Sequence, residues 1–151
     1  MKLARIVKTF VLLDSKEKRL FIEAFIFLAW GRILKSMPFS KVAPILGEHM
    51  EESSFNRNPS EEKLLKNISN AIYIMSNYTP WQSKCLVKAI AAMKMLQRRQ
   101  IDCTLYLGTG RDEDGQLAAH AWLRSGTLII TGEEVMDQFT VVGKFARCMN
   151  G

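Results

Sequence analysis

The chain of 151 residues has few of the residues that build metal centres or disulfide frameworks. It contains three cysteines, Cys85, Cys103 and Cys148, and two histidines, His49 and His120. No two cysteines form a CxxC pair, and an odd number cannot be fully paired, so zinc-finger, zinc-protease and disulfide-rich classes are excluded. At least one free thiol is typical of a reducing compartment, and we therefore expect a cytoplasmic protein without a metal.

Phosphate-binding glycine motifs and membrane segments are missing as well. Neither GxxxxGK[ST] nor GxGxxG occurs, so we expect no nucleotide cofactor. The N-terminal segment has an uninterrupted apolar stretch of only Phe10–Leu13 with no small-residue cleavage site after it, so we expect no secretion signal. The apolar run Leu20–Trp30 contains Glu23 and is shorter than the roughly 20 residues that span a bilayer. These absences predict a soluble protein with no membrane span.

What remains is an ordinary globular composition. Apolar residues make up 48% of the chain and charged residues 24%, which excludes a disordered protein. The length fits one domain. The formal net charge of +6 favours anionic partners, but aromatic residues do not alternate with the basic ones, so we expect no nucleic-acid binding.

Apolar residues follow helical spacing over the first 98 residues and alternate in the remainder. Asp14, Ser40, Ser60 and Ser83 are the expected N-caps of successive helices, and a polar loop covers Glu48–Pro59. The expected strands and turns, in chain order, are Cys103–Leu107, a turn over Gly108–Gly115, Gln116–Leu123, a tight turn at Ser125-Gly126, Thr127–Thr131, a helical turn over Glu133–Gln138, and Phe139–Phe145. Helices followed by an antiparallel meander predict an α+β fold.

Cys85 is the first candidate for chemistry. It lies in the first turn of the helix expected after Ser83, where unpaired backbone N–H groups and the positive end of the helix dipole stabilise a thiolate. Lys84 and Lys88 add positive charge nearby. The alternative is a small buried residue that packs beneath Trp81.

His120, in the sequence AHAW, is the second candidate. On a strand it shares one face with Trp122, while Ala119 and Ala121 share the other. The rise per residue along the intervening helix and strands allows His120 to lie within roughly 10 Å of Cys85, measured along the helix axis. A helix-start cysteine and a strand histidine are the layout of papain-like and transglutaminase-like enzymes, whereas a lone histidine can also be structural.

An imidazole base needs an acceptor on its second ring nitrogen. If Ser125-Gly126 is the hairpin turn, counting outward puts Glu133 diagonal to His120, with Glu134 and Asp137 as competitors and a solvated surface acid as the alternative. The Cys85 backbone N–H is the expected first donor to an oxyanion. The second donor is the Trp81 indole or the Gln82 amide, each of which has a packing or solvated alternative.

The stretch YTPWQSKCLVKAIAAMKMLQRRQIDCTLYLG, followed by AHAWLRSGTLIITGEE and FTVV, resembles the leader peptidases of lasso-peptide biosynthesis, which are transglutaminase-like cysteine proteases. The similarity covers roughly Tyr78–Val142. It implies that Cys85 is the nucleophile and His120 the base, and it departs from the family where TGEE replaces the usual Asp. It also implies a single domain with a helical part over 1–77 and a transglutaminase-like catalytic core over 78–151.

The resemblance implies an enzyme that removes the leader from a ribosomally made precursor, so that a separate ATP-dependent cyclase can close the macrolactam ring. Met1–Pro59 lacks the alternating pattern of a winged-helix domain, so a separate leader-binding winged-helix protein is the expected partner. A non-catalytic module that binds the precursor or the cyclase, and a transglutaminase-type acyltransferase, are the alternatives.

Overall fold

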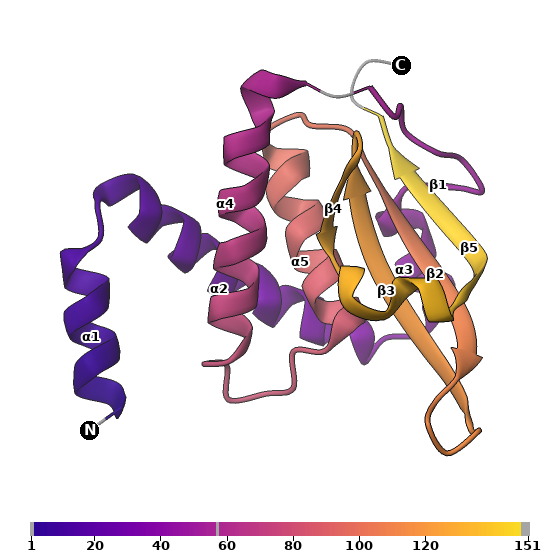
Figure 1. The fold of residues 1–151 in the computed structure, drawn as a ribbon, viewed down its shortest axis with the longest axis horizontal. Coiled ribbons are helices and arrows are strands. Elements are labelled where there is room, and N and C mark those ends of the chain that lie inside the picture. Colours follow the sequence, from indigo (N-terminus) through magenta and orange to yellow (C-terminus); the bar gives the residue numbers. More distant parts are fainter. Residues whose placement is uncertain (1, 57, 149–151) are drawn as a thin grey trace.

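The computed structural model describes residues 2–56 and 58–148 and shows an α+β fold in which four of the five sheet strands follow the α-helices along the chain (Figure 1). Within this part of the chain, no helix is long and apolar enough to cross a bilayer. The elements, in order, are α1 (Lys2–Leu12), α2 (Ser15–Lys35), α3 (Phe39–Leu46), β1 (Glu48–His49), α4 (Pro59–Ser76), α5 (Cys85–Arg98), β2 (Cys103–Arg111), β3 (Leu117–Ser125), β4 (Leu128–Thr131), the 3₁₀ helix η1 (Glu133–Gln138) and β5 (Thr140–Arg147).

Of the N-caps expected from the sequence, Asp14 is confirmed and Ser60 is not. The Asp14 side chain accepts the Glu17 N–H at 2.8 Å, as expected of the α2 cap. The prediction of a Ser60 cap is wrong, because Pro59 occupies the first position of α4 and Asn58 becomes the cap, accepting the Ser60 N–H at 3.2 Å. Proline is suited to that position because its missing N–H would be unpaired there anyway.

The sheet contains five strands in the order β1-β5-β2-β3-β4, all antiparallel. The expected meander is therefore only partly right: β2, β3 and β4 follow one another, but β5 returns to the far side of β2. Strand β1 was predicted as part of a loop, since two residues carry no readable pattern. The β3–β4 turn lies at Gly126-Thr127 rather than Ser125-Gly126, with Gly126 at φ 57°, a backbone conformation that glycine adopts without strain.

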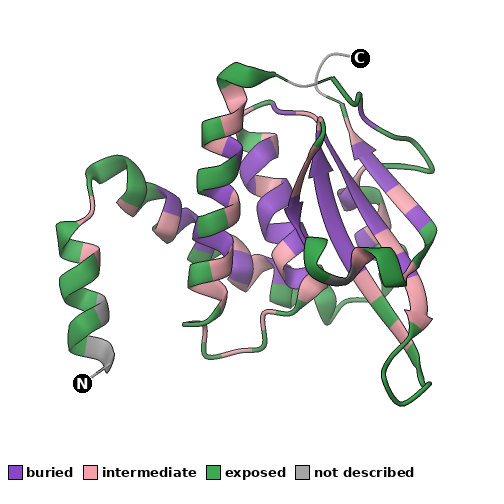
Figure 2. Cartoon of the chain, in the orientation of Figure 1, coloured by how far each residue is buried: buried purple, intermediate pink, exposed green. Residues whose placement is uncertain are grey.

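Helix α5 forms the centre of the core (Figure 2). It packs against α2, α4 and one face of the sheet. Eight of its residues are fully buried: Val87, Ala89, Ile90, Ala91, Ala92, Met93, Met95 and Leu96. From the sheet, Leu105, Leu123 and Phe145 belong to the same core cluster. Small and flexible side chains let α5 lie in close contact with both layers, which fixes the position of its first residue.

The opposite face of the sheet is covered by a polar segment that Arg124 holds in place. This side chain is 4% exposed. It donates to the Tyr106 hydroxyl at 2.9 Å and to the carbonyls of Ser53 at 2.9 Å and Ser54 at 3.1 Å. Its guanidinium also lies 3.6 Å from the centroid of the Phe55 ring. Burial of a cation is tolerated here because each contact satisfies one of its donors.

Arg124→Met keeps the apolar stem and removes the guanidinium. We expect it to lower the free energy of unfolding by about 2–4 kcal/mol, since the carbonyls of Ser53 and Ser54 and a tyrosine hydroxyl lose their partner. Arg111→Met is the matched control, because Arg111 is exposed and, within the described residues, its side chain donates to the Gly115 carbonyl alone. Urea unfolding measures both, and equal small losses in the two variants would contradict this role of Arg124.

Candidate active site

Cys85 is the first residue of α5 and is half-buried. The helix N-cap is Lys84, whose side chain makes no capping hydrogen bond, so the prediction of a Ser83 cap is wrong. The Ser83 hydroxyl instead lies 2.8 Å from the Thr79 hydroxyl within the preceding loop. Among the described residues, no capping side chain accepts a hydrogen bond at this helix start beside the Cys85 thiol.

The loop before α5 positions the two residues expected to stabilise an oxyanion. Trp81 packs on Phe25 of α2, with ring centroids 5.3 Å apart, and its indole nitrogen is buried without a hydrogen-bond partner among the described residues. Gln82 is exposed. An unpaired buried N–H is an unused donor, which distinguishes Trp81 from Gln82.

His120 lies on β3 within a column of aromatic rings. Its ring stacks on Trp122 at a centroid distance of 5.7 Å and lies 5.1 Å from the Phe139 ring. Ala121 belongs to the core cluster on the other face, as the alternation of the strand predicts. The rings on both sides restrict the rotation of the imidazole, which is half-buried.

The acceptor that holds His120 is a peptide carbonyl. The His120 Nε2 atom lies 2.9 Å from the Gly132 oxygen. A carbonyl can only accept, so Nε2 carries the hydrogen and Nδ1 is left as the unprotonated nitrogen of the neutral ring. Gly132 adopts φ 81°, and a Cβ there would lie 3.0 Å from Nε2. Glycine therefore permits this approach of the chain to the ring.

Glu133, the expected orienting acid, is exposed and makes no hydrogen bond with His120 among the residues described. The expected position came from pairing His120 with Thr131. In the structure Thr131 pairs with Leu123, and the chain then leaves the sheet at Gly132 to begin η1. This shift in register brings a backbone carbonyl, and not the Glu133 carboxylate, to the imidazole.

A residue that the sequence gave no reason to select, Tyr73 of α4, holds the other side of Gly132, through its N–H. The Gly132 N–H donates to the Tyr73 hydroxyl at 3.0 Å, and that hydroxyl is hydrogen-bonded to the Glu134 carboxylate. The Lys88 ammonium lies 4.9 Å from the centroid of the Tyr73 ring. These contacts join α4, α5 and η1 beside the imidazole.

The charges around Tyr73 set two pKa values in opposite directions. Burial, together with the hydrogen bond to Glu134, raises the pKa of Tyr73 to about 12. The same hydrogen bond lowers the pKa of Glu134, and electrostatic interactions with Lys88 and His120 lower it further. Glu134 is therefore ionised and Tyr73 protonated throughout the neutral range.

The structure places Cys85 and His120 on elements that pack together, α5 and β3, but it does not join the two side chains by a hydrogen bond. Cys85 borders the core cluster between α5 and the sheet, whereas His120 belongs to the ring column on the other face. Lys88, one turn after Cys85, acts on Glu134 electrostatically and so does His120. Lys88 on the helix of the thiol and His120 on the sheet therefore both interact electrostatically with the same carboxylate.

The other two thiols differ from Cys85. Cys103 is 1% exposed, and burial raises its pKa to about 12. Cys148 is exposed, and desolvation together with nearby carboxylates, Asp102 first among them, raises its pKa. None of the three cysteines forms a disulfide. In the described part of the chain, no three His, Cys, Asp or Glu side chains are grouped to bind a metal ion.

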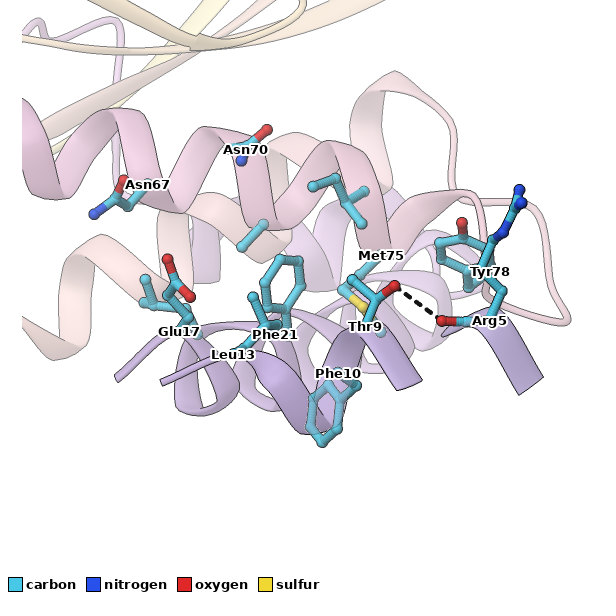
Figure 3. A pocket seen from close by; sticks show the side chains of 13 residues that line it. Arg5, Thr9, Phe10, Leu13, Glu17, Phe21, Asn67, Asn70, Met75 and Tyr78 are labelled. Atoms are coloured by element: carbon cyan, nitrogen blue, oxygen red, sulfur yellow. Dashed lines mark hydrogen bonds between the residues drawn. The ribbon is translucent and has the colours of Figure 1, made fainter. Parts of the chain in front are cut away.

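Of two hollows on the surface, one lies away from this site and the other borders it. A groove of about 360 Å³ between α1, α2 and α4 is lined by Phe10, Phe21, Met75 and Tyr78 among others, and neither Cys85 nor His120 reaches it (Figure 3). A second hollow of about 440 Å³ lies between α4 and β4. Its lining includes Tyr73 and Glu133, so it opens next to the peptide that holds His120.

A helix-start thiol, an imidazole on an antiparallel strand and an α+β core together define a candidate thiol enzyme. Residues 33–144 match the transglutaminase-like superfamily, and the chain belongs to it. The fold of this superfamily commonly carries cysteine peptidase or acyltransferase chemistry. No curated protein and no solved structure shows a significant match to the chain.

Gly132→Ala tests the contact that holds the imidazole. We expect it to displace the ring from the Gly132 carbonyl and to cost about 1–3 kcal/mol of stability, because the new Cβ would lie 2.6 Å from the Ala121 oxygen at a positive φ. Nitrogen NMR of the ring gives the Nε2–H tautomer. Gly115→Ala is the control, since Gly115 has φ 76° and no atom within 4 Å of a Cβ. The same tautomer in Gly132→Ala and the wild type would contradict this explanation.

The raised pKa of Tyr73 predicts a specific response to alkali. In an absorbance titration, one of the three tyrosines should ionise near pH 12 rather than near the usual value of about 10, and Tyr73→Phe should remove that step. A pKa raised by folding gives stability that is complete below about pH 10 and is lost as the pH rises toward 12. Identical late titration steps in the two proteins would show that another tyrosine is responsible.

Proposed function

We propose that this chain is a cysteine peptidase that removes the leader from a ribosomally made lasso precursor peptide before the macrolactam ring closes. The observation that carries the proposal is the thiol of Cys85 at a helix start without a capping side chain, on a helix that packs against the strand of a tautomerically fixed His120. Membership of the transglutaminase-like superfamily and the resemblance of residues 78–142 to lasso leader peptidases support the same conclusion.

His120 has the hydrogen arrangement of a general base. With Nε2–H donated to the Gly132 carbonyl, Nδ1 is free to take the proton of the Cys85 thiol. The thiolate then attacks the carbonyl carbon of the last leader residue. As that C–N bond breaks, the imidazolium returns the proton to the leaving amine, which becomes the N-terminus of the released peptide. Water hydrolyses the remaining thioester and frees the thiol.

Backbone and indole N–H groups serve the developing oxyanion. The Cys85 N–H lies at the uncapped first turn of α5, and the buried indole N–H of Trp81 is an unused donor on the loop before it. Cys85 and His120 must come into contact during the reaction. Catalytic hydrogen bonds are commonly long or poorly aligned before substrate binds and tighten in the complex, and we assign that closure to precursor binding.

The proposal includes three partners: the precursor peptide, a separate leader-binding winged-helix protein, and the ATP-dependent cyclase that consumes the new amino terminus. We place the enzyme in the cytoplasm, where thiols stay reduced, and three cysteines without a disulfide fit that location. The acid that the sequence assigned to Glu133 is replaced in this mechanism by the Gly132 carbonyl.

Cys85→Ala and His120→Ala test the two reacting groups. Each should reduce leader removal by roughly a thousandfold or more, because the nucleophile or its base is lost and direct attack by water is far slower. Mass spectrometry with the precursor and the winged-helix partner present measures the rate. Cys148→Ala is the matched control and should process the precursor at the wild-type rate. Full processing by Cys85→Ala would leave only a precursor- or cyclase-binding role.

The superfamily match favours one alternative at the same thiol, an acyltransferase in which an amine replaces water. Adding a primary amine to the processing reaction separates the two activities by the mass of the released leader. A peptidase releases the free acid at every amine concentration, whereas an acyltransferase releases the amide in proportion to the amine.

A further inference from the structure

Helix α2 is apolar on two opposite faces, and one of them is exposed. Its buried face, which includes Ala24 and Leu28, packs against α4 and α5. The helical repeat puts three isoleucines on the other side, where Ile22 is 51%, Ile26 56% and Ile33 62% exposed. A helix that is apolar all round is normally buried all round, because burial of both faces is favourable. One apolar face of α2 is thus left uncovered by the described residues.

The exposed isoleucines form a narrow stripe along α2. Together with the half-buried Ala29 they follow one another at spacings of four, three and four residues, as in a helix that packs lengthwise along another helix. We call Ile22, Ile26, Ala29 and Ile33 the α2 seam. At about 100° per residue, its members span about 60° of the helix circumference. A helix that lies in a membrane surface needs an apolar face of roughly 100° or more, so the seam fits a partner helix better than a lipid surface.

The charged side chains beside the α2 seam are cations. By the helical repeat, Lys18 and the exposed Arg32 lie on one side of it, and the exposed Arg19 lies on the other. The two acids of α2 are placed elsewhere. Glu23 is buried in an ion pair, and Glu17 lines the groove toward α4. An apolar stripe with cations on both sides is complementary to an apolar stripe with carboxylates on both sides.

The positive charge of the chain is concentrated in the same region. Residues 2–35 contain eight Lys and Arg against three Asp and Glu, so they account for five of the six net positive charges. A second copy of this chain is a poor occupant for that reason. Arg19 would meet its own equivalent in a parallel pairing and Arg32 in an antiparallel one, and like charges at such positions are destabilising.

We propose that the α2 seam binds an amphipathic helix of another protein, one with apolar residues at heptad spacing and Asp or Glu on both sides of them. The apolar side chains of that helix cover the isoleucines, and its carboxylates pair with Arg19 and Arg32. This inference goes beyond the proposed function, because it does not depend on the chemistry of Cys85. The partner helix lies across α2 from α5, the helix that carries the thiol.

The probe is a synthetic three-heptad peptide with Leu at positions a and d and Glu at e and g. It is titrated into the full chain, in which the isoleucine methyl groups are labelled for NMR. The signals of Ile22, Ile26 and Ile33 should shift with a Kd of about 10–500 µM, as expected of a small transient interface. The signals of the fully buried Ile68 and Ile90 should stay in place. Raising NaCl from about 50 to about 500 mM should weaken binding about threefold or more, because the ion pairs are exposed.

The double variant Ile22→Gln/Ile26→Gln removes half of the seam and places good helix formers at exposed positions. We expect it to bind the acidic peptide about tenfold more weakly or worse, while the methyl signals of the buried isoleucines show that it is folded. Leu117→Gln is the matched control, since Leu117 is 77% exposed and lies on β3, and it should bind as the wild type does.

A second peptide with Lys in place of Glu tests the role of charge. It should bind the wild-type chain about tenfold more weakly than the acidic peptide, because its cations face Arg19 and Arg32. Equal affinities for the two peptides would overturn the proposal, as would the absence of shifts at the α2 seam. Shifts at Ile74 in place of the seam would put the peptide in the groove between α1, α2 and α4, and would also overturn it.

Two further measurements identify the other occupants. Sedimentation that shows a dimer of the wild type but not of Ile22→Gln/Ile26→Gln would assign the seam to a second copy. Co-sedimentation with phosphatidylglycerol vesicles, lost in the same variant and without binding of the acidic peptide, would assign it to a lipid surface. Either result overturns the proposal. None of these measurements uses leader removal, so the proposed function and this inference fail independently.

Discussion

The burial of α5 between α2, α4 and the sheet is the constraint on which the site depends. A helix enclosed by α2, α4 and the sheet cannot slide or rotate without opening the core, so its first residue has a fixed position. Cys85 is that residue. Bidentate contact between Arg99, just after the other end of α5, and Glu23 of α2, at 2.7 and 2.8 Å, anchors the helix at its C-terminal end.

The edge of the sheet beside α5 is closed by polar side chains of α4. Ser69 donates to the Ile130 carbonyl at 2.6 Å, and one turn later Tyr73 accepts the Gly132 N–H. An unprotected edge strand offers unpaired backbone groups to other chains, and α4 satisfies two of them on β4 and the residue after it. The same contacts fix Gly132, the residue whose carbonyl holds His120, so protection of the edge and orientation of the imidazole have one structural cause.

Local patterns were sufficient to predict the elements that carry Cys85 and His120. Period-3.6 spacing predicted the α5 stripe, and period-2 alternation predicted that His120 and Trp122 share a face, which their stacked rings confirm. The helical turn over Glu133–Gln138 is also confirmed. These features depend on neighbours within a few residues, and the sequence contains that information directly.

The acceptor of the imidazole could not be predicted in this way. Its position depends on the irregular pairing of β3 with β4 and on the positive φ of Gly132, neither of which has a periodic signal. Tyr73 lies 59 residues from Gly132, and only the packing of α4 on the sheet edge brings them together. The glycine before two acids in TGEE was the one local sign that the chain turns there.

Proximity of the Cys85 sulfur to the His120 ring is the central claim, and a short bifunctional alkylator tests it most directly. 1,3-Dibromoacetone first alkylates a reactive thiol and then reacts with a nucleophile within a few ångströms of it. In the presence of the precursor's leader, the account predicts a cross-link between the peptides that contain Cys85 and His120, at Nδ1. Cys85 modified without a second attachment, or attached to any other residue, would contradict it.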